Sequence, residues 1–212
     1  MNNTTNQGQV IGEVVAKSEE DGASDKYFQL KVKVKRLSEA YDTIPVTLSQ
    51  NLLKSGMTAE IGESVALKGE FRSYNKVVEG KSKLMLHFYA QSRAEGEEPN
   101  TIELNGFVCK PPVYRVTPFN REICDILLAV NRPQGHSDIL KSDYIPCIIW
   151  GKNARLMQDK PVGTQLKLVG RIQSREYTKK LPNGDAETRT AYEVSCQNLE
   201  IVRSDLCNAL SQ

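Results

Sequence analysis

Val169-Gly170-Arg171-Ile172-Gln173-Ser174-Arg175 is the most informative segment of the chain, because residues 68–74, Lys-Gly-Glu-Phe-Arg-Ser-Tyr, carry the same glycine and serine 101 positions earlier. The same spacing joins Pro45 to Pro146 and Gly62 to Gly163. Agreement at four separate anchors indicates that one unit of sequence occurs twice in the chain.

Further upstream the spacing between the two copies shortens. Gly12 corresponds to Gly106, and Arg36 corresponds to Arg132, as small loop insertions between shared strands would produce. We therefore expect an N-terminal domain at 1–94, an acidic linker at 95–99 and a C-terminal domain at 100–212. Copies of this size can each bury a hydrophobic core of their own.

Strands dominate both copies. In residues 27–36 the apolar side chains alternate with Gln29, Lys31, Lys33 and Lys35, which is typical of a half-buried strand. Similar strands are expected near 122–132, around both Ile-Pro pairs, and at 64–74, 84–90, 165–177 and 190–197, with short helices at 49–55 and 152–158. A turn at Pro182-Asn183-Gly184-Asp185 favours a hairpin. This order predicts an all-β chain of two tandem OB-fold barrels, five-stranded Greek keys with a short helix between strands 3 and 4.

Composition excludes several functional classes. The net charge is only +2, and the sequence has no apolar run near the ~20 residues that span a bilayer. The polar start at 1–9 lacks the apolar part of a secretory signal, so we expect a cytoplasmic protein without membrane contact. Five cysteines without a Cys-x-x-Cys pair, and two histidines at no metal-ligand spacing, predict neither metal nor cofactor.

Four segments of the second copy stand out, and they are Asn105–Val108, Leu128–Arg132, Ile148–Ala154 and Gly170–Tyr177. In this order, over nearly all of 100–202, they resemble the bacterial single-stranded DNA-binding protein family. Residues 150–154, Trp-Gly-Lys-Asn-Ala, match the end of the family's third strand, and Gly170 to Tyr177 matches its fourth. The first copy resembles the family only through the second.

The resemblance implies aromatic side chains that stack on bases, and it places them at Trp150, Tyr144 and Tyr177. The residues themselves support two of these positions, because Tyr144, Pro146, Ile148 and Trp150 share one face of a strand with period two. Aromatic platforms beside cations bind single strands without reading their sequence. The competing interpretation is that Trp150 and Tyr144 fill the core.

Cations near these aromatics are the candidate phosphate contacts. Alternation places Arg171, Gln173, Arg175 and Tyr177 on one face. The candidate set is Lys152, Arg155, Arg171, Arg175, Lys179, Lys180 and Arg132. Arg132 has a counterpart in Arg36, which leaves a structural role in the fold open for both.

The first copy lacks the three stacking residues in register, since Ser49, Thr43 and Lys76 stand in their places. Tyr41 and Tyr74 are its neighbouring aromatics. The secondary candidates in this copy are Lys31, Lys33, Lys35, Arg72, Tyr74 and Lys76. We expect the first copy to support assembly or to give weaker electrostatic contact, while the second copy grips bases.

The predicted function is therefore binding of single-stranded DNA in replication, recombination or repair, without catalysis. The sequence has no Gly-x-Ser-x-Gly and no phosphate loop. The alternative is an interaction module resembling the primosomal replication protein, in which protein contacts outweigh DNA binding. The resemblance also implies a homodimer with four barrels, and residues 205–212 lack the family's acidic recruitment tail.

Overall fold

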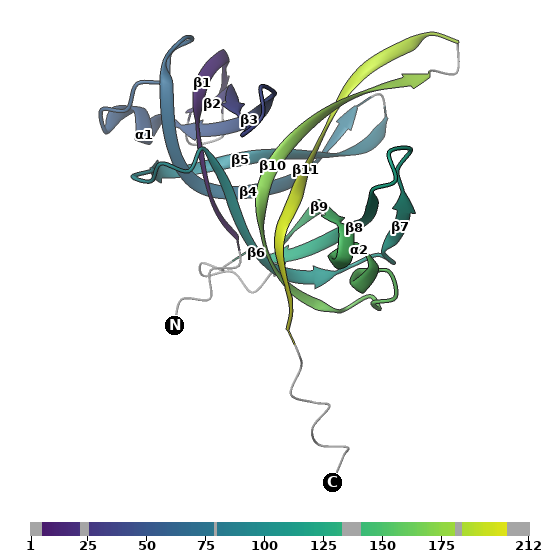
Figure 1. The fold of residues 1–212 in the computed structure, drawn as a ribbon. Coiled ribbons are helices and arrows are strands. Elements are labelled where there is room, and N and C mark those ends of the chain that lie inside the picture. Colours follow the sequence, from purple (N-terminus) through teal and green to yellow (C-terminus); the bar gives the residue numbers. More distant parts are fainter. Residues whose placement is uncertain (1–5, 22–25, 79, 133–140, 181–183, 203–212) are drawn as a thin grey trace.

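The computed structural model describes residues 6–21, 26–78, 80–132, 141–180 and 184–202 of the chain. Within these ranges there are eleven strands and two short helices (Figure 1). The elements are β1 (Asn6–Asp21), β2 (Lys26–Lys35), β3 (Tyr41–Ser49), α1 (Gln50–Lys54), β4 (Ser64–Val78), β5 (Lys81–Arg93), β6 (Asn100–Val108), β7 (Val113–Val116), β8 (Glu122–Asn131), β9 (Ser142–Trp150), α2 (Gly151–Met157), β10 (Gln165–Lys180) and β11 (Ala186–Ile201).

Strands β1 to β5 close the first barrel. β1 pairs with both β2 and β4, β2 pairs with β3, β4 pairs with β5, and the parallel pairing of β3 with β5 closes the ring. Helix α1 lies between β3 and β4. This is the predicted OB-fold order, and the structure confirms it.

The second barrel repeats this arrangement with β6, β8, β9, β10 and β11. Helix α2 again lies between the third and fourth barrel strands. Strand β7 is an addition that the sequence reading missed, and it pairs with β8 from Val113↔Asp125 to Val116↔Glu122. It forms one end of the sheet order, so the second barrel carries an extra edge strand.

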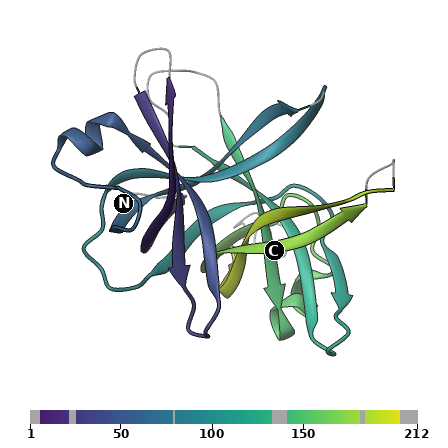
Figure 2. The ribbon, with the colours of Figure 1, turned by 90° about the horizontal axis from the view of Figure 1, so that it is seen from above.

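The two barrels share one continuous sheet. The start of β1 pairs antiparallel with the start of β6, from Asn6↔Leu104 to Val10↔Asn100. The hairpins β4–β5 and β10–β11 extend beyond their barrels, as the views from the front and from above both show (Figures 1 and 2). The sheet therefore fixes the position of one barrel relative to the other.

The alternation predicted from sequence fills both cores. Leu30, Val32 and Val34 of β2 are buried, whereas Lys31, Lys33 and Lys35 are exposed. In the second barrel Ile145, Cys147 and Ile149 of β9 point inward. The cores of the two barrels belong to one cluster of buried residues, because the shared sheet connects them.

The glycine that the two copies share, Gly69 and Gly170, lies at a β-bulge in each barrel. The ladder shifts between Lys68 and Gly69 in β4, and between Val169 and Gly170 in β10. A Cβ atom on Gly69 would lie 2.1 Å from the Tyr89 carbonyl oxygen, and one on Gly170 would lie 2.3 Å from that of Ser195. Only glycine allows this close approach of two backbones.

The acidic segment 95–99 has no regular secondary structure, but it is held against β1. The Gln9 side-chain amide donates to the Glu98 carbonyl at 2.6 Å, and the Ile11 amide donates to the Pro99 carbonyl at 2.8 Å. The proposed domain boundaries around this segment stay a prediction. The hairpin expected near Pro182 exists as β10–β11, although residues 181–183 lie outside the described ranges.

Candidate nucleic-acid interface

The outer face of β9 carries the two aromatics that sequence placed there. Tyr144 is 44% exposed and Trp150 is partly buried, while Ile145 and Ile149 between them point into the core. The Trp150 indole Nε1 donates a hydrogen bond to Ser195 Oγ on the neighbouring strand β11, at 3.1 Å. This contact holds the ring against the sheet, with its position set by two strands.

Strand β10 carries the third aromatic. Tyr177 is 40% exposed and lies across from Arg189 in the part of the β10–β11 hairpin that projects from the barrel. Arg175 is two positions earlier on the same face, with its Nε 3.7 Å from Glu193 Oε1. Lys179 and Lys180 follow at the end of β10, and both are exposed. The hairpin thus presents an aromatic ring among cations.

Two further candidate cations lie on α2, directly after Trp150. Lys152 is exposed. Arg155 donates through Nε to Glu122 Oε2 at 2.7 Å, and its side chain is still 66% exposed. The Tyr114 hydroxyl of β7 donates to the other oxygen of Glu122 at 2.7 Å, which links the extra strand to the helix.

The structure gives Arg132 a place in the contact between barrels. Its guanidinium makes two hydrogen bonds to Asp143, at 2.8 and 2.6 Å, and donates to the Ser73 carbonyl of the first barrel at 2.9 Å. Arg36 repeats this pattern from the first barrel, with Asp42 at 2.8 and 2.6 Å and the Ser174 carbonyl of the second barrel at 3.2 Å. The structural role left open for this pair therefore applies to both.

Arg171 belongs to the same contact. Its Nη1 donates to Asp42 Oδ2 at 2.7 Å, and its Nη2 donates to Gln173 at 3.0 Å. Desolvation lowers the pKa of Arg171, the carboxylate of Asp42 raises it, and the nearby charge of Arg36 lowers it further. Because Arg132 and Arg171 are committed to buried carboxylates, we remove both from the set of candidate phosphate contacts.

In the first copy, the secondary candidates all lie on the outer face. Lys31, Lys35 and Lys76 are exposed. The ammonium of Lys33 lies 4.3 Å from the centre of the Tyr41 ring. Arg72 pairs with Glu70 at 2.7 Å and lies 4.0 Å from the centre of the Tyr89 ring, a contact that the sequence reading did not foresee.

Two titratable groups on these faces were missed by the sequence reading. Glu193 of β11 is only 9% exposed and accepts a hydrogen bond from the Gln173 amide at 2.6 Å. In the first barrel, burial lowers the pKa of His87 to about 4, with a further lowering by the charge of Arg72. His87 is therefore neutral at physiological pH. Strand pairing brings these groups into place, and no single position of the sequence indicates which strands pair.

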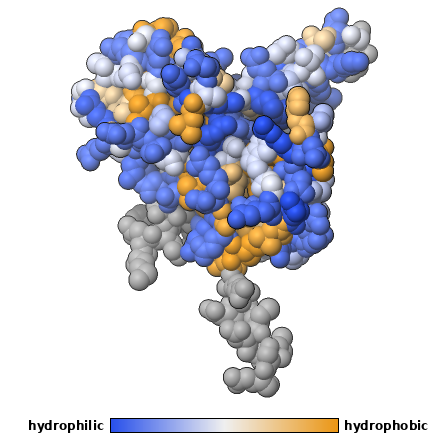
Figure 3. Space-filling view, viewed as in Figure 1, coloured by the Kyte–Doolittle hydropathy of each residue, from blue (hydrophilic) through white to orange (hydrophobic). Residues whose placement is uncertain are grey.

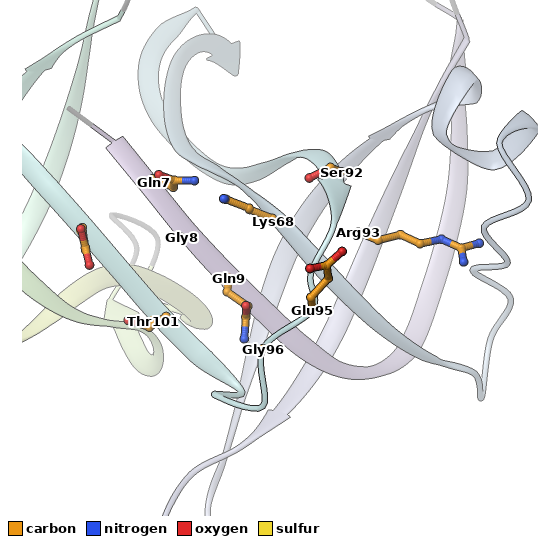
Figure 4. Close-up of a pocket in the computed structure, with 10 residues that line it drawn as sticks. Gln7, Gly8, Gln9, Lys68, Ser92, Arg93, Glu95, Gly96 and Thr101 are labelled. Atoms are coloured by element: carbon orange, nitrogen blue, oxygen red, sulfur yellow. The ribbon is translucent and has the colours of Figure 1, made fainter. Parts of the chain in front are cut away.

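A polar hollow of about 540 Å³ lies beside the β1–β6 pairing (Figure 4). Gln7 and Gln9 of β1, Lys68 of β4 and Thr101 of β6 line it, with Glu95 and Gly96 of the connecting segment. It contains none of the aromatics proposed to stack. In the front view the molecular surface is mostly hydrophilic, with separate hydrophobic patches (Figure 3).

Within the described ranges, no group of three or more metal-ligating side chains occurs, and no helix is long and apolar enough to cross a membrane. Burial raises the pKa of the Cys147 thiol well above its usual range and that of Cys196 to about 11. These two thiols therefore behave as small apolar core residues.

Known proteins share the sequence pattern of the second barrel. A model of the "Single-strand binding protein family" matches residues 99–202. The single-stranded DNA-binding protein 3 of Streptococcus agalactiae serotype V is 31% identical over 107 residues, which cover 50% of this chain and 75% of that protein. The chain belongs to the single-strand binding protein family. A second family member, the single-stranded DNA-binding protein of Enterococcus faecalis, is 34% identical over 107 residues, and the match spans 55% of its length.

A solved structure extends the family's fold to both barrels. The wild-type single-stranded DNA binding protein from Thermus aquaticus superposes with a TM-score of 0.69 at 17% identity. The match covers 94% of this chain and 93% of that one. The first barrel, which the family model does not reach, therefore shares the fold of a family member.

Proposed function

We propose that this protein binds single-stranded DNA without sequence preference and without catalysing a reaction, protecting the strand in replication, recombination or repair. One observation carries the proposal: Trp150, Tyr144 and Tyr177 lie outside the barrel core, on the copy that the family model matches. Bases have flat faces, and stacking on an aromatic ring stabilises binding by about 1–3 kcal/mol per base.

Five cations remain as proposed phosphate contacts after Arg132 and Arg171 are removed. They are Lys152, Arg155, Arg175, Lys179 and Lys180. If each contacts one phosphate, the logarithm of the binding constant should fall with the logarithm of salt concentration with a slope of about −3.5.

We also propose a homodimer as the functional assembly, because each chain supplies two barrels and the family resemblance implies four. Two copies related by a twofold axis would form a closed assembly. Sedimentation velocity gives the mass directly, and a single species at the mass of one chain would refute the dimer.

The test is a titration with a thymidine homopolymer at two salt concentrations. Trp150 is the single tryptophan, so its fluorescence reports on the second barrel directly. We expect strong quenching and an affinity that falls steeply with salt. Tyr144→Ala and Tyr177→Ala should each weaken binding about 5- to 150-fold, as loss of one stacked base predicts.

The matched control is Phe119→Ala, because Phe119 is 87% exposed in the turn between β7 and β8. It should leave the affinity unchanged. Unchanged Trp150 fluorescence together with no binding in a mobility assay would refute DNA binding and favour the interaction module resembling the primosomal replication protein.

A further inference from the structure

Strand pairing shows which residues of the two barrels are equivalent near the bulges. Gly69 pairs with Ala90 and Gly170 pairs with Cys196, so Tyr89 of β5 occupies the position of Ser195 of β11. At the end of β3, Ser49 occupies the position of Trp150. The second barrel thus places Trp150 beside Ser195, whereas the first places a serine on β3 and an aromatic ring on β5. The aromatic side chain of the first barrel therefore lies on β5, the strand that neighbours β3.

Tyr89 is part of a group of rings on the outer face of the first barrel. The rings of Tyr74 and His87 meet edge to face at 5.3 Å, and those of His87 and Tyr89 meet at 6.4 Å. Arg72 lies 4.0 Å above the Tyr89 ring and is held there by Glu70, which also accepts from Gln91 at 2.9 Å. We call Arg72, Tyr74, His87 and Tyr89 the first-barrel platform.

The buried side chain of Thr47 contacts the first-barrel platform at His87. Thr47 is 5% exposed, and its hydroxyl donates to Gln29 Oε1 at 2.9 Å. The same hydroxyl contacts His87 Nδ1 at 2.5 Å. His87 is thus held in place by Thr47, and its lowered pKa keeps the ring neutral. A neutral, fixed ring suits stacking and gives up little conformational entropy on binding.

Exposure and charge around the platform suit a single strand. Tyr74 is 45% exposed, and Tyr41, with Lys33 above it, is 48% exposed. Lys31, Lys35 and Lys76 are exposed on the same face. Planar guanidinium and aromatic groups stack on bases, and the surrounding ammonium groups attract phosphates.

We propose that the first-barrel platform is a second base-stacking site for single-stranded DNA, built from residues that do not correspond to Tyr144, Trp150 and Tyr177. This inference rests on the proposed function of the second barrel. It replaces the expectation that the first copy gives only assembly or weak electrostatic contact, which came from comparing β3 positions alone.

The experiment measures the number of thymidine nucleotides bound per chain at saturation, from Trp150 quenching during titration with a long homopolymer. The variant Tyr74→Ala/Tyr89→Ser gives position 89 the residue that the second barrel has at Ser195. We expect the nucleotides bound per chain to fall by about a third to a half, with the depth of Trp150 quenching unchanged.

Arg72→Gln tests the platform with a smaller change in packing and should also lower the number of nucleotides per chain. Tyr74→Phe/Tyr89→Phe keeps the rings and should behave as the wild type. The control Lys54→Ala removes an exposed cation on α1 and should have no effect.

The possible failures are distinguishable. If Arg72→Gln and Tyr74→Ala/Tyr89→Ser bind as many nucleotides per chain as the wild type, while Trp150 is still quenched, the first-barrel platform is refuted and the proposed function stands. If the wild type itself neither binds nor changes in fluorescence, the proposed function fails and this inference fails with it.

Discussion

Replacing Asp42 by asparagine should destabilise the protein more than the same change at Asp143. Both carboxylates are 1% exposed and occupy equivalent positions in the contact between barrels. Each makes two hydrogen bonds with an arginine of its own barrel and accepts the backbone amide of a serine in the other barrel, Ser174 at 2.7 Å and Ser73 at 2.6 Å. Among the residues that the structure describes, Asp42 alone of the two has a second arginine, Arg171, at 2.7 Å.

The expected magnitudes follow from these contacts. Removing one partner of a buried ion pair costs about 3–5 kcal/mol. Arg36 and Arg132 are 27% and 28% exposed, so solvent reduces the loss, and we expect about 3 kcal/mol for Asp143→Asn. Asp42→Asn also removes a charged hydrogen bond, worth about 1.5–3 kcal/mol and at the low end here because Arg171 is 26% exposed, and leaves Arg36 facing Arg171, which gives a loss of about 4–5 kcal/mol.

Equilibrium unfolding in urea, followed by circular dichroism, measures both losses. The control is the Arg171→Gln background, in which Asp42 keeps the kinds of partner that Asp143 has and, in addition, a long 3.4 Å contact from the Ser174 hydroxyl. There the two substitutions should cost nearly the same. Equal losses in the wild-type background would contradict the assigned role of Arg171, as would a difference that persists without it.

Three further predictions concern stability. The pKa of His87 is lowered from 6.5 to about 4 by burial and then by Arg72, so the unfolded chain takes up its proton first as the pH falls. Between pH 6.5 and 4 the wild type should therefore lose up to about 3 kcal/mol more than His87→Gln, and parallel pH profiles of urea unfolding would contradict this. Asn6→Ala should cost about 2–3 kcal/mol, because Asn6 is 5% exposed and makes hydrogen bonds to both the amide and the carbonyl of Phe71. Asn100→Ala, with the same bonds to Ile172 in a less buried place, should cost less. Gly170→Ala should lower the melting temperature further than Gly163→Ala, since the first adds an atom 2.3 Å from a backbone oxygen and the second only strains a φ of +91° in open space.

The sequence predicted the barrels because their strands alternate and because the two copies share anchors at one spacing. It missed β7, whose four residues follow Pro111-Pro112 and are too few to show a period. The outer ends of β4, β5, β10 and β11 were also missed. Their side chains, such as Val77 and Lys179, are exposed on both faces, so burial leaves no pattern there.

The hydrogen-bond partners of the candidate cations could not be predicted from the sequence, for a different reason. Arg171 meets a carboxylate 129 positions away, and Arg132 contacts a backbone carbonyl 59 positions away, so neither partner can be read from spacing. Tyr89 was overlooked because the two copies differ in length between β4 and β5. The single offset that aligns Gly69 with Gly170 does not align Tyr89 with Ser195.

The contact between barrels is reciprocal, and this bears on how one strand of DNA would use both faces. The start of β3 holds Ser174 of β10, and the start of β9 holds Ser73 of β4, with each serine hydroxyl accepting the amide of Thr43 or Tyr144. Tyr74 directly follows Ser73, so the residue next to a first-barrel ring accepts, through its side-chain hydroxyl, the backbone amide of Tyr144. Since these bonds and the β1–β6 pairing fix the two faces before DNA arrives, a strand that binds one face would reach the other without the entropy cost of orienting a free domain. A flexible linker would also join the two sites, but with a lower effective concentration, so under the proposed function the fixed interface would favour one strand engaging both faces.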